Sequence, residues 1–591
     1  MPHILAISVG PVQDFIAAAR KTRDLWAGSE MLSEISRAVA TAVESHVNAG
    51  NLVFPPQTGI EQIANKIVAV VPDGKDPVMI AATARECAEK LLEEWLDSAN
   101  GAKQTCENSG VKKGINWAAA RAQVEDFLEY YAAWCPYEAD NGYAAARVNA
   151  DRLLAGRKAL RDFQQAVSEP GVPKSSLDGG RDAVVNGKQL TTGNRLALGI
   201  REGELLDGIS LMKRLYKKDS LRFVSVSRVA ADPFIRALPD CLVQTMSKSL
   251  EELAATPFVQ KLGKAPAHYE RCPYDTQLFY GPPSDAEMNK EGLDDGKQGA
   301  VKGFCEWLFE QTKLRPCPYV AVLHADGDFM GALISSLKSK DAHRKLSEWL
   351  AAFAREAGQI VEKNYGSLVY SGGDDVLAFL PLDTALKCAA ELHEAFEAAL
   401  ELCCPPGLDR KPSLSVGVAI GHYSAPLQKL IEWSREAEHA AKGRKDANGK
   451  VVKNALAVHL HTHSAGDDFV ESVRGWDENP VQDYWEKWTG LLRDEKLSNQ
   501  AAYHLRALCR ELRDAGLGGS PVLEKEARRI IARKREGRGG SAVTQAVQDA
   551  LIGGSAHFSL EKLQRTVSEL IISRRLVEAD MGTGATGGSN P

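Results

Sequence analysis

The first hundred residues alternate short apolar runs with longer stretches of helical period. The run at residues 4–9 predicts a buried strand, which breaks at Gly10 and Pro11. In chain order the pattern predicts a strand at 4–9, helices at 12–23 and 29–45, strands at 52–54 and 66–71, and a helix at 81–96. This order is most of a ferredoxin-like βαββαβ unit.

A second unit with the same order begins near residue 318. In chain order the pattern predicts a strand at 319–323, helices at 328–338 and 342–363, a hairpin at 367–381, a helix at 382–402, a strand at 413–420, a helix at 426–442 and a last strand at 455–460. The chain is therefore expected to hold two related α/β (α+β) units, although no strong residue-level repeat accompanies the shared order.

The remaining segments are mostly helical in pattern. Residues 116–167 carry aromatic side chains on recurring helical faces, and the chain after about residue 465 is helical in period to residue 578. The last residues contain nothing to bury and are expected to be disordered. The predicted division is a first unit at 1–100, a mixed helical linking region at 101–315 that could return to complete the first unit, a second unit at 316–463, a helical region at 464–580 and a tail at 581–591.

Composition narrows the class of protein. The chain has 591 residues, 44% of them hydrophobic and 25% charged, which is typical of a soluble globular protein with two to four domains. A net charge of −6 argues against a generic polyanion binder, so contacts with nucleic acid must come from local patches or partner subunits. Eleven cysteines without a CxxC pair, no signal peptide and no long apolar run predict a cytoplasmic protein without a membrane helix.

The most informative chemistry is a Ser-Gly-Gly-Asp-Asp turn at 371–375, between the two strands of the predicted hairpin. Its glycines permit positive φ and leave room for a phosphate. Asp326 ends the strand expected beside the hairpin, within reach of Asp374 and Asp375. Such hard carboxylates suit Mg²⁺ or Mn²⁺ in a two-metal nucleotidyl transferase. The alternative for the turn alone is a hairpin with solvated acids.

Two further segments could contact a nucleotide. Lys442 ends the helix before the last strand and could reach a nucleotide phosphate, or it could simply complement the helix C-terminus. The break at Gly10 and Pro11 leads into a helix whose amide groups, with Arg20, Lys21 and Arg23 nearby, favour anions. The alternative there is a surface helix with solvated charges. The first unit has no GGDD turn of its own.

Two other groups of residues are weaker candidates. His459, His461 and His463 alternate on one face, as ligands of a metal ion might, but no cysteine or acid accompanies them. The basic helix at 524–538 could contact RNA phosphates, although a solvated or subunit-facing helix explains it as well.

Four of these segments together resemble a known family. They are SVGPVQDFIAAARKTRDLWAGSEMLSE at 8–34, YVAVLHADGDFMG at 319–331, YSGGDDVLAFLP at 370–381 and VVKNALAVHLHTHSAG at 451–466. In this order they resemble the large polymerase–cyclase subunit of type III CRISPR effector complexes, in its Cmr form. The likeness covers most of residues 1–463, and the C-terminal helices resemble the family's last domain only in character.

The resemblance implies a fold, an activity and partners. The two units would be palm-type nucleotidyl cyclase domains, joined by a linking domain and followed by a helical domain. The activity would be synthesis of cyclic oligoadenylates from ATP, switched on when a crRNA-guided complex of Cmr-type subunits binds target RNA. Asp326, Asp374 and Asp375 would hold the metals, while Ser371, Gly372, Gly373 and Lys442 would contact one ATP and Gly10, Gln13 and Ser29 the second.

The chain departs from the family pattern at two points. Many members begin with an HD nuclease domain, whereas no His-Asp pair occurs here, so HD-type DNase activity is not expected. Members often carry a four-cysteine zinc site in the linking domain, where this chain has Lys-Ser-Ser-Leu-Asp-Gly-Gly at 174–180, so a structural zinc ion is doubtful.

Two competing hypotheses stay open at this point. The chain could be a catalytically silent scaffold for crRNA and neighbouring subunits, although its intact acids argue against decay. It could also be a free-standing diguanylate-cyclase-like enzyme or a template-copying polymerase. The absence of a sensor domain and of a recognisable basic template channel argues against these.

Overall fold

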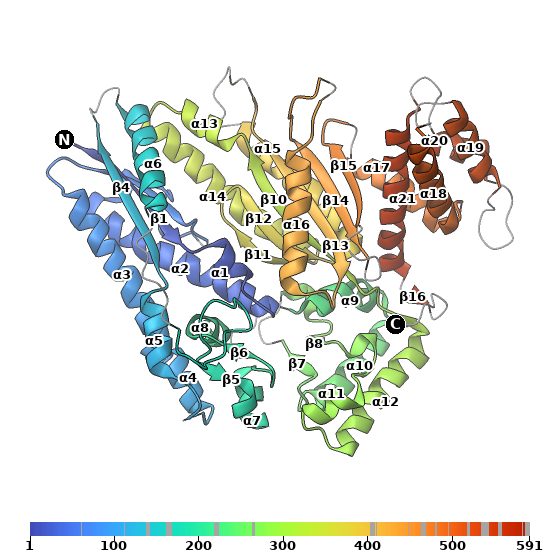
Figure 1. Ribbon diagram of the computed structural model, residues 1–591, viewed down its shortest axis with the longest axis horizontal. Coiled ribbons are helices and arrows are strands. Elements are labelled where there is room, and N and C mark those ends of the chain that lie inside the picture. The colour runs from blue at the N-terminus through green and yellow to red at the C-terminus, as the bar shows by residue number, and fades with distance from the viewer. Residues whose placement is uncertain are drawn as a thin grey trace.

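The computed structural model describes the chain as two sheet units, a linking region below them and a helical C-terminal part at the right of Figure 1. All residues are described except 61, 112, 138–141, 161–167, 218–223, 263–265, 402–407, 409, 447, 463–468, 479–480, 495, 517–520, 534–542, 553–557, 582 and 585–591. Within the described part, every cysteine is a free thiol. No described helix combines the length and the apolar character needed to cross a bilayer.

The first part is built on a four-stranded antiparallel sheet in the order β2-β3-β1-β4. Its elements are β1 (His3–Gly10), α1 (Gln13–Ala17), α2 (Thr22–Val47), β2 (Leu52–Phe54), β3 (Lys66–Val71), α3 (Pro77–Asp97), α4 (Ala102–Asn108), α5 (Trp117–Glu125), β4 (Glu129–Pro136) and α6 (Tyr143–Ala159). The side chains of β1 point alternately to the two faces of the sheet, and helices cover both faces, so the strand is buried on each side. Leu5 and Ile7 pack with α2 and α3, while Ile4 and Ala6 pack with α6.

Residues 129–136 correct the helical prediction for 116–167, because they form strand β4 between helices α5 and α6. The strand completes the first sheet beside β1. Its aromatic residues follow a period of two rather than that of a helix: Tyr130 and Trp134 pack on one face, and Tyr131 on the other. Aromatic side chains suit a half-buried sheet surface, and the long-range pairing with β1 decides the conformation.

The linking region lies below the two sheets in Figure 1 and contains helices with two two-stranded ladders, β5–β6 and β7–β8, among its described residues. Its elements are β5 (Val185–Asn186), α7 (Thr192–Leu198), β6 (Leu205–Leu206), α8 (Gly208–Leu215), α9 (Val226–Ala237), α10 (Asp240–Leu253), β7 (Val259–Lys261), β8 (Tyr274–Thr276), α11 (Asp285–Lys290), α12 (Asp295–Thr312) and β9 (Leu314–Arg315). Helices α10 and α12 share an apolar core with the β7–β8 ladder.

The third part is a six-stranded sheet in the order β11-β12-β10-β13-β14-β15. Its elements are β10 (Tyr319–Asp328), α13 (Met330–Ser336), α14 (Lys340–Lys363), β11 (Ser367–Ser371), β12 (Asp375–Leu380), α15 (Leu382–Glu401), β13 (Ser413–His422), α16 (Leu427–Lys442), β14 (Ala455–His461) and β15 (Phe469–Gly475). The first four strands in this part have the same spatial order as those of the first sheet. The predicted pair of βαββαβ units is therefore confirmed.

Strand β15 is a second correction, because the sequence pattern after residue 465 predicts helix. It pairs antiparallel with β14, whereas β14 itself runs parallel to β13. The side chains at 469–472 alternate between exposed and buried, starting from the exposed Phe469. This short period is the signature of a strand with one covered face, and the edge of β14 supplies its backbone hydrogen bonds.

The helical C-terminal part packs on β15 and α15 through α21, as the right side of Figure 1 shows. Its elements are α17 (Val481–Arg493), α18 (Asn499–Asp514), α19 (Pro521–Ala532), α20 (Gln545–Ile552), α21 (Leu560–Met581) and β16 (Thr583–Gly584). Strand β16 pairs with β9 of the linking region. The rest of the predicted disordered tail after residue 584 lies outside the described residues.

The two sheet units face each other with α2 and α14 between them. Val320 of β10 and Phe379 of β12 belong to the same apolar core as β1 and α2. The Arg344 guanidinium of α14 donates hydrogen bonds to backbone carbonyls of the first unit, at 2.7 Å to that of Ala49. The two units therefore pack against each other and form one body.

Candidate active site

The two acidic segments found in the sequence lie side by side on neighbouring strands. Asp326 of β10 is the direct cross-strand partner of Asp375 at the start of β12. The Gly327 amide donates to the Asp374 carbonyl at 3.0 Å, and the turn closes through Gly373 at φ 109°. A Cβ on residue 327 would lie 2.8 Å from the Cβ of Asp374, so only glycine allows this approach.

A cavity of about 380 Å³ opens beside these acids, between the two sheet units. The second unit contributes its acids, the turn and one cation, and the first unit contributes α1, α2 and the segment before β3. The described lining residues are Val12, Gln13, Ile16, Ser29, Leu32, Ser33, Ser36, Gln62, Ile63, Ala64, Asn65, Asp326, Tyr370, Ser371, Gly372, Asp374, Asp375 and Arg435. The site therefore exists only where both units meet.

Neighbouring side chains hold two of the three acids in place. Asp326 forms an ion pair with Lys442 of α16, whose ammonium group also lies 3.0 Å from Glu438. Asp375 accepts a hydrogen bond from the Tyr370 hydroxyl at 3.1 Å and lies 3.1 Å from Nε2 of His324. The sequence predicts a contact of Lys442 with a nucleotide phosphate, whereas in the structure its charge lies against an acid of the site.

The environment changes the protonation of the site. Burial raises the pKa of Asp374 to about 6, and the negative charge of Asp375 adds to the effect. Burial, with the charge of Asp375, also raises the pKa of Tyr370 well above its usual value, so Tyr370 stays a hydrogen-bond donor. A cluster of acids whose charges repel one another in a poorly hydrated place is a favourable position for cations.

Asp328, the last acid of the HADGD segment, has a structural role. It is fully buried and accepts hydrogen bonds from the hydroxyls of Ser413 and Ser415 at 2.8 and 2.7 Å, and from the amide of Asn454 at 3.1 Å. These contacts tie the end of β10 to β13 and to the segment before β14. Asp328 does not line the cavity among the described residues.

Helix α2 presents a face of small polar residues that the sequence reasoning recognised only in part. Ser29, Ser33 and Ser36 lie one helical turn apart and all line the cavity. Ser33 accepts a hydrogen bond from the Ile63 amide at 2.9 Å, whereas the Ser36 hydroxyl is buried without a partner in the described part of the chain. The spacing of serines in an otherwise apolar stretch is the signal that could have identified this face.

Gln62 and Arg435 are further lining residues that the sequence did not single out. The Gln62 side chain accepts a hydrogen bond from the Ser371 amide at 2.6 Å and so bridges the first unit to the GGDD turn. The Arg435 guanidinium of α16 forms no ion pair with a described residue. A free guanidinium beside a cavity is suited to a phosphate group.

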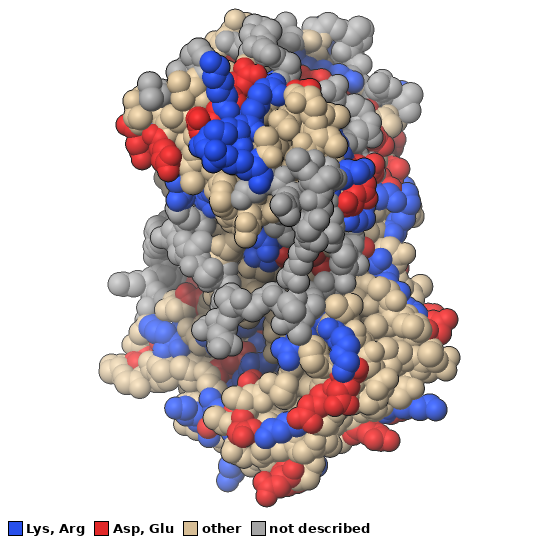
Figure 2. Space-filling view, turned by 90° about the vertical axis from the view of Figure 1, so that its right-hand side faces the viewer, with Lys and Arg blue, Asp and Glu red and all other residues tan. Residues whose placement is uncertain are grey.

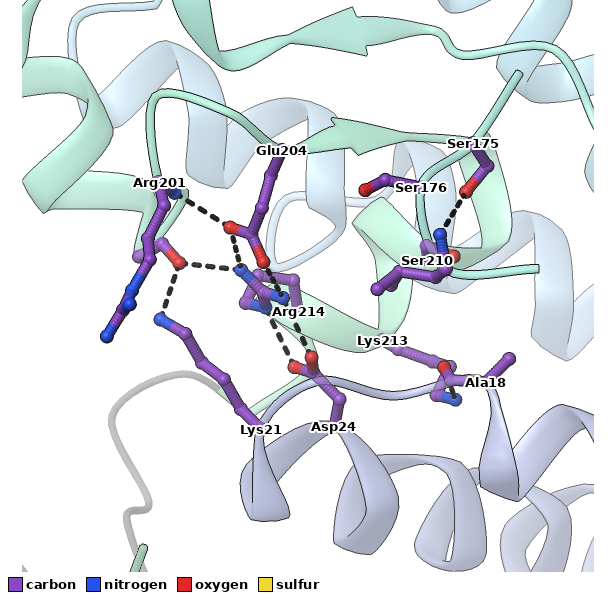
Figure 3. A network of polar contacts seen from close by, with 12 residues as sticks. Ala18, Lys21, Asp24, Ser175, Ser176, Arg201, Glu204, Ser210, Lys213 and Arg214 are labelled. Atoms are coloured by element: carbon purple, nitrogen blue, oxygen red, sulfur yellow. Dashed lines mark hydrogen bonds and ion pairs between the residues drawn. The ribbon is translucent and has the colours of Figure 1, made fainter. Parts of the chain in front are cut away.

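The cavity wall formed by α1 and α2 is fixed by a buried charge network from α8, drawn in Figure 3. Arg214 donates to both carboxylate oxygens of Asp24 at 2.8 Å and also contacts Glu204 at 3.0 Å. The adjacent Lys213 donates to the carbonyls of Phe15 and Ala18 at the end of α1, at 2.5 and 3.0 Å. Burial alone would raise the pKa of Asp24, but Arg214 outweighs it and lowers that pKa.

The other residues expected near the second nucleotide divide into two groups. Gln13 and Ser29 line the cavity, whereas Gly10 lies opposite Glu129 in the β1–β4 ladder and is not among the described lining residues. The basic residues of the expected anion site donate to carbonyls of the linking region, Lys21 to that of Gly199 at 2.8 Å and Arg23 to that of Tyr216 at 2.9 Å. Their charges therefore face the linking region.

The carboxylates of Asp326, Asp374 and Asp375 line a polar cavity, and carboxylates are the ligands that hard divalent cations prefer. No three His, Cys, Asp or Glu side chains of the described residues lie close enough together to hold one ion. On Asp326, the ammonium group of Lys442 occupies the place of a cation. Binding of a divalent ion there would require Lys442 to move away.

Two of the three histidines considered as metal ligands contact protein groups instead. His459 is buried and pairs with Glu471 at 2.9 Å, and His461 stacks on Trp433 at 4.0 Å between ring centroids. His463 lies outside the described residues. Within the expected zinc region, Lys174 pairs with Asp182 at 2.7 Å.

The basic helix found at 524–538 has two arginines that form ion pairs within the protein. Arg528 of α19 pairs with Glu524 and with Asp549 of α20, at 3.0 and 2.8 Å. Arg529 pairs with Glu526 at 2.6 Å. Residues 534–538 lie outside the described part. Two of the described positive charges of this helix are therefore compensated by acids of the same region.

Comparison with known proteins finds two matching domain families and a relative that matches over most of this chain. The model described as "Cas10/Cmr2, second palm domain" matches residues 319–456, and "CRISPR-associated protein Cmr2, N-terminal" matches residues 4–100. A curated relative, the CRISPR system Cmr subunit Cmr2 of Pyrococcus furiosus, is 25% identical over 575 residues, which cover 80% of this chain and 63% of the relative. The chain thus spans less than two thirds of that relative's length.

Solved structures share the fold. A chain of the type III-B Cmr-beta complex in its apo state has a TM-score of 0.62 at 14% identity, covering 97% of this chain and 82% of that chain. A chain of Cmr-beta bound to cognate target RNA has a TM-score of 0.61 at 14% identity, covering 97% and 83%. This likeness shows a shared fold, and the two domain matches show that residues 4–100 and 319–456 are similar to the corresponding domains of Cmr2 proteins.

Proposed function

We propose that the chain is a metal-dependent nucleotidyltransferase that joins ATP molecules into cyclic oligoadenylates. The observation that carries the proposal is the cavity between the two sheet units, which brings Asp326, Asp374 and Asp375 together with Arg435 and the serines of α2. A cavity made by two related units suits two copies of one substrate. Acids on one wall suit triphosphates that arrive with divalent cations. Neutral polar groups on the other wall suit nucleosides.

The chain's own residues have separable roles in this proposal. Asp326, Asp374 and Asp375 would hold Mg²⁺ or Mn²⁺, which when bound would make a ribose 3′-hydroxyl a better nucleophile and neutralise the leaving pyrophosphate. Arg435 would orient a triphosphate, together with the backbone of Gly372, which lines the same cavity. Gln13, Ser29 and Ser36 would contact the second nucleotide.

The reaction is a phosphoryl transfer that needs position and charge more than covalent help from the protein. The 3′-oxygen of one ATP forms a bond to the α-phosphorus of the other, the bond to the β-phosphate oxygen breaks, and the hydroxyl proton passes to solvent. Tyr370 and His324 keep Asp375 oriented toward the cavity during this step. A last attack within the chain of adenylates closes the ring.

We further propose that the chain works with other Cmr-type subunits, a crRNA and a target RNA. The curated relative is named as a subunit of a Cmr system, and one similar structure is titled as bound to cognate target RNA. The product and its dependence on target RNA can therefore be tested in the assembled complex.

The decisive variant is Asp374→Asn/Asp375→Asn in that complex, supplied with ATP, Mg²⁺ and target RNA. Loss of both turn acids is expected to reduce product formation by about 10³-fold or more, because the positioned charge is removed. Glu356→Gln/Glu362→Gln removes two exposed acids of α14 and is expected to leave the rate unchanged. Mass spectrometry of the product identifies the ring and its size.

A second candidate function is a catalytically silent scaffold, favoured by the ion pair that places Lys442 on Asp326. In that case the native complex would release no pyrophosphate from ATP in the presence of target RNA. Products made from GTP, or a linear copy of a template, would instead favour a diguanylate-cyclase-like enzyme or a polymerase. Native activity that survives the Asp374→Asn/Asp375→Asn change would refute the assignment of the site.

A further inference from the structure

A second cavity, of about 480 Å³, lies far along the chain from the acids, between β15 and the C-terminal helices α18 and α21. Arg506, Arg510 and Arg513 of α18 line it, and we refer to these three residues as the arginine row. They follow one another at three to four residues and therefore share one face of the helix. Arg565 of α21 adds a fourth guanidinium from the opposite wall.

The cavity is strongly positive. Glu471 is the one acid among its described lining residues, and it is paired with His459 at 2.9 Å. Arg506 and Arg513 form no ion pair with a described residue. Figure 2, where the C-terminal helices face the viewer, shows Lys and Arg side chains gathered in the upper part of this face. Arg565 pairs with Glu478 at 3.4 Å, so Arg506 and Arg513 carry the uncompensated positive charge of the cavity, which favours an anionic ligand.

Aromatic rings accompany the arginines at the surface. Phe469, at the start of β15, lines the cavity yet stays 39% exposed, and its ring stacks on His461 at 5.0 Å. Tyr503, one turn before Arg506 on α18, is 42% exposed. The side-chain amide nitrogen of Gln564 is buried at the cavity without a partner among the described residues. This nitrogen is a hydrogen-bond donor left for a ligand.

We propose that the arginine row and Phe469 bind a single-stranded polynucleotide, the arginines holding successive phosphates while the phenylalanine stacks against a base. Guanidinium groups one turn apart suit a repeating phosphate backbone. An acidic peptide would use the same charges but would gain little from an exposed aromatic ring supported from behind by a histidine. The aromatic residue therefore favours nucleic acid.

The proposal does not depend on the ATP site, because the two cavities share no described lining residue. It also differs from the hypothesis about the basic helix at 524–538, where Arg528 and Arg529 pair with acids of the same region. The binding surface proposed here lies on α18 and β15, outside that helix.

The test measures fluorescence anisotropy of labelled, unstructured single-stranded RNA and DNA with the full chain at rising salt concentration. Arg506→Gln/Arg513→Gln is expected to weaken binding about tenfold at low salt and to lower the slope of log affinity against log salt by about 1.4, for two lost phosphate contacts. Phe469→Ala should weaken binding with the slope unchanged, because stacking releases no counterions.

The matched control is Lys345→Gln/Arg355→Gln, which removes two exposed positive charges from α14. Binding by this control should match the native chain. RNA and DNA that bind alike would identify backbone recognition, and a preference for RNA would add contacts to the 2′-hydroxyl. The proposal is overturned if the arginine pair and the control behave alike, or if polyglutamate displaces the oligonucleotide and Phe469→Ala has no effect.

Discussion

At the scale of the residue, Arg435 is the cation of the central cavity that has no acidic partner in the described part of the chain. If it holds a triphosphate, Arg435→Gln should raise the KM for ATP about tenfold, equivalent to the loss of one charge-assisted hydrogen bond, with kcat nearly unchanged. Steady-state kinetics of the assembled complex checks this. Lys429→Gln, on the same helix but paired with Glu432, is the control. A lowered kcat at constant KM would contradict the proposed role of Arg435.

The sequence identified the acids of the site but not most of its wall. Asp374 and Asp375 are recognisable because the turn and its strands are consecutive in the chain. Asp326 is recognisable because it follows the apolar run of the preceding strand. Gln62, Ser36 and Arg435 come from separate segments, and only the packing of α2 against the second unit brings them to one cavity. Local patterns carry no information on such contacts.

At the scale of the element, α8 fixes the position of α2 through the buried pairs of Arg214 with Asp24 and Glu204, all at most 3% exposed. Arg214→Met would leave two buried carboxylates without a counter-charge and should cost about 3–5 kcal/mol of stability. Chemical unfolding followed by fluorescence measures the loss. Arg121→Met, which removes an exposed pair with Asp97, should have a small effect. Equal effects of the two variants would show that the network does not hold α2.

The order of helices and strands in both units could be predicted, because each has several consecutive elements of clear period. Strands β4 and β15 could not, for a shared physical reason. Each is a short segment next to helices in the chain. Strand β4 is held by its pairing with β1, far earlier in the chain, and β15 by its pairing with the edge of β14. Tertiary pairing overrides the local preference in such segments.

At the scale of the whole molecule, the two sheet units meet partly through His343 of α14, whose Nδ1 lies 2.8 Å from the hydroxyl of Tyr143 on α6. Burial lowers the pKa of His343 to about 4, with smaller effects from Arg147 and Lys66, while Asp151 opposes them. Below pH 6.5 the unfolded chain therefore binds a proton that the folded chain excludes. Stability should fall as the pH drops from about 6.5 to 4.

His343→Gln should make this loss of stability shallower by about one proton over the same range of pH. The measurement is the free energy of unfolding by urea at a series of pH values, for the native chain and the variant. His46→Gln, a change at a partly exposed histidine of α2, serves as the control. A slope that stays the same in His343→Gln would remove this histidine from the acid sensitivity of the interface.

The central claim is that the acids at the meeting point of the two sheets bind divalent cations beside ATP. The most direct measurement is the structure of the chain with Mn²⁺ and a non-hydrolysable ATP analogue, with the ions located by anomalous scattering. The account predicts manganese at Asp326 and the turn acids, the triphosphate near Arg435, and Lys442 displaced from Asp326. Manganese absent from these carboxylates while the nucleotide binds elsewhere would contradict it.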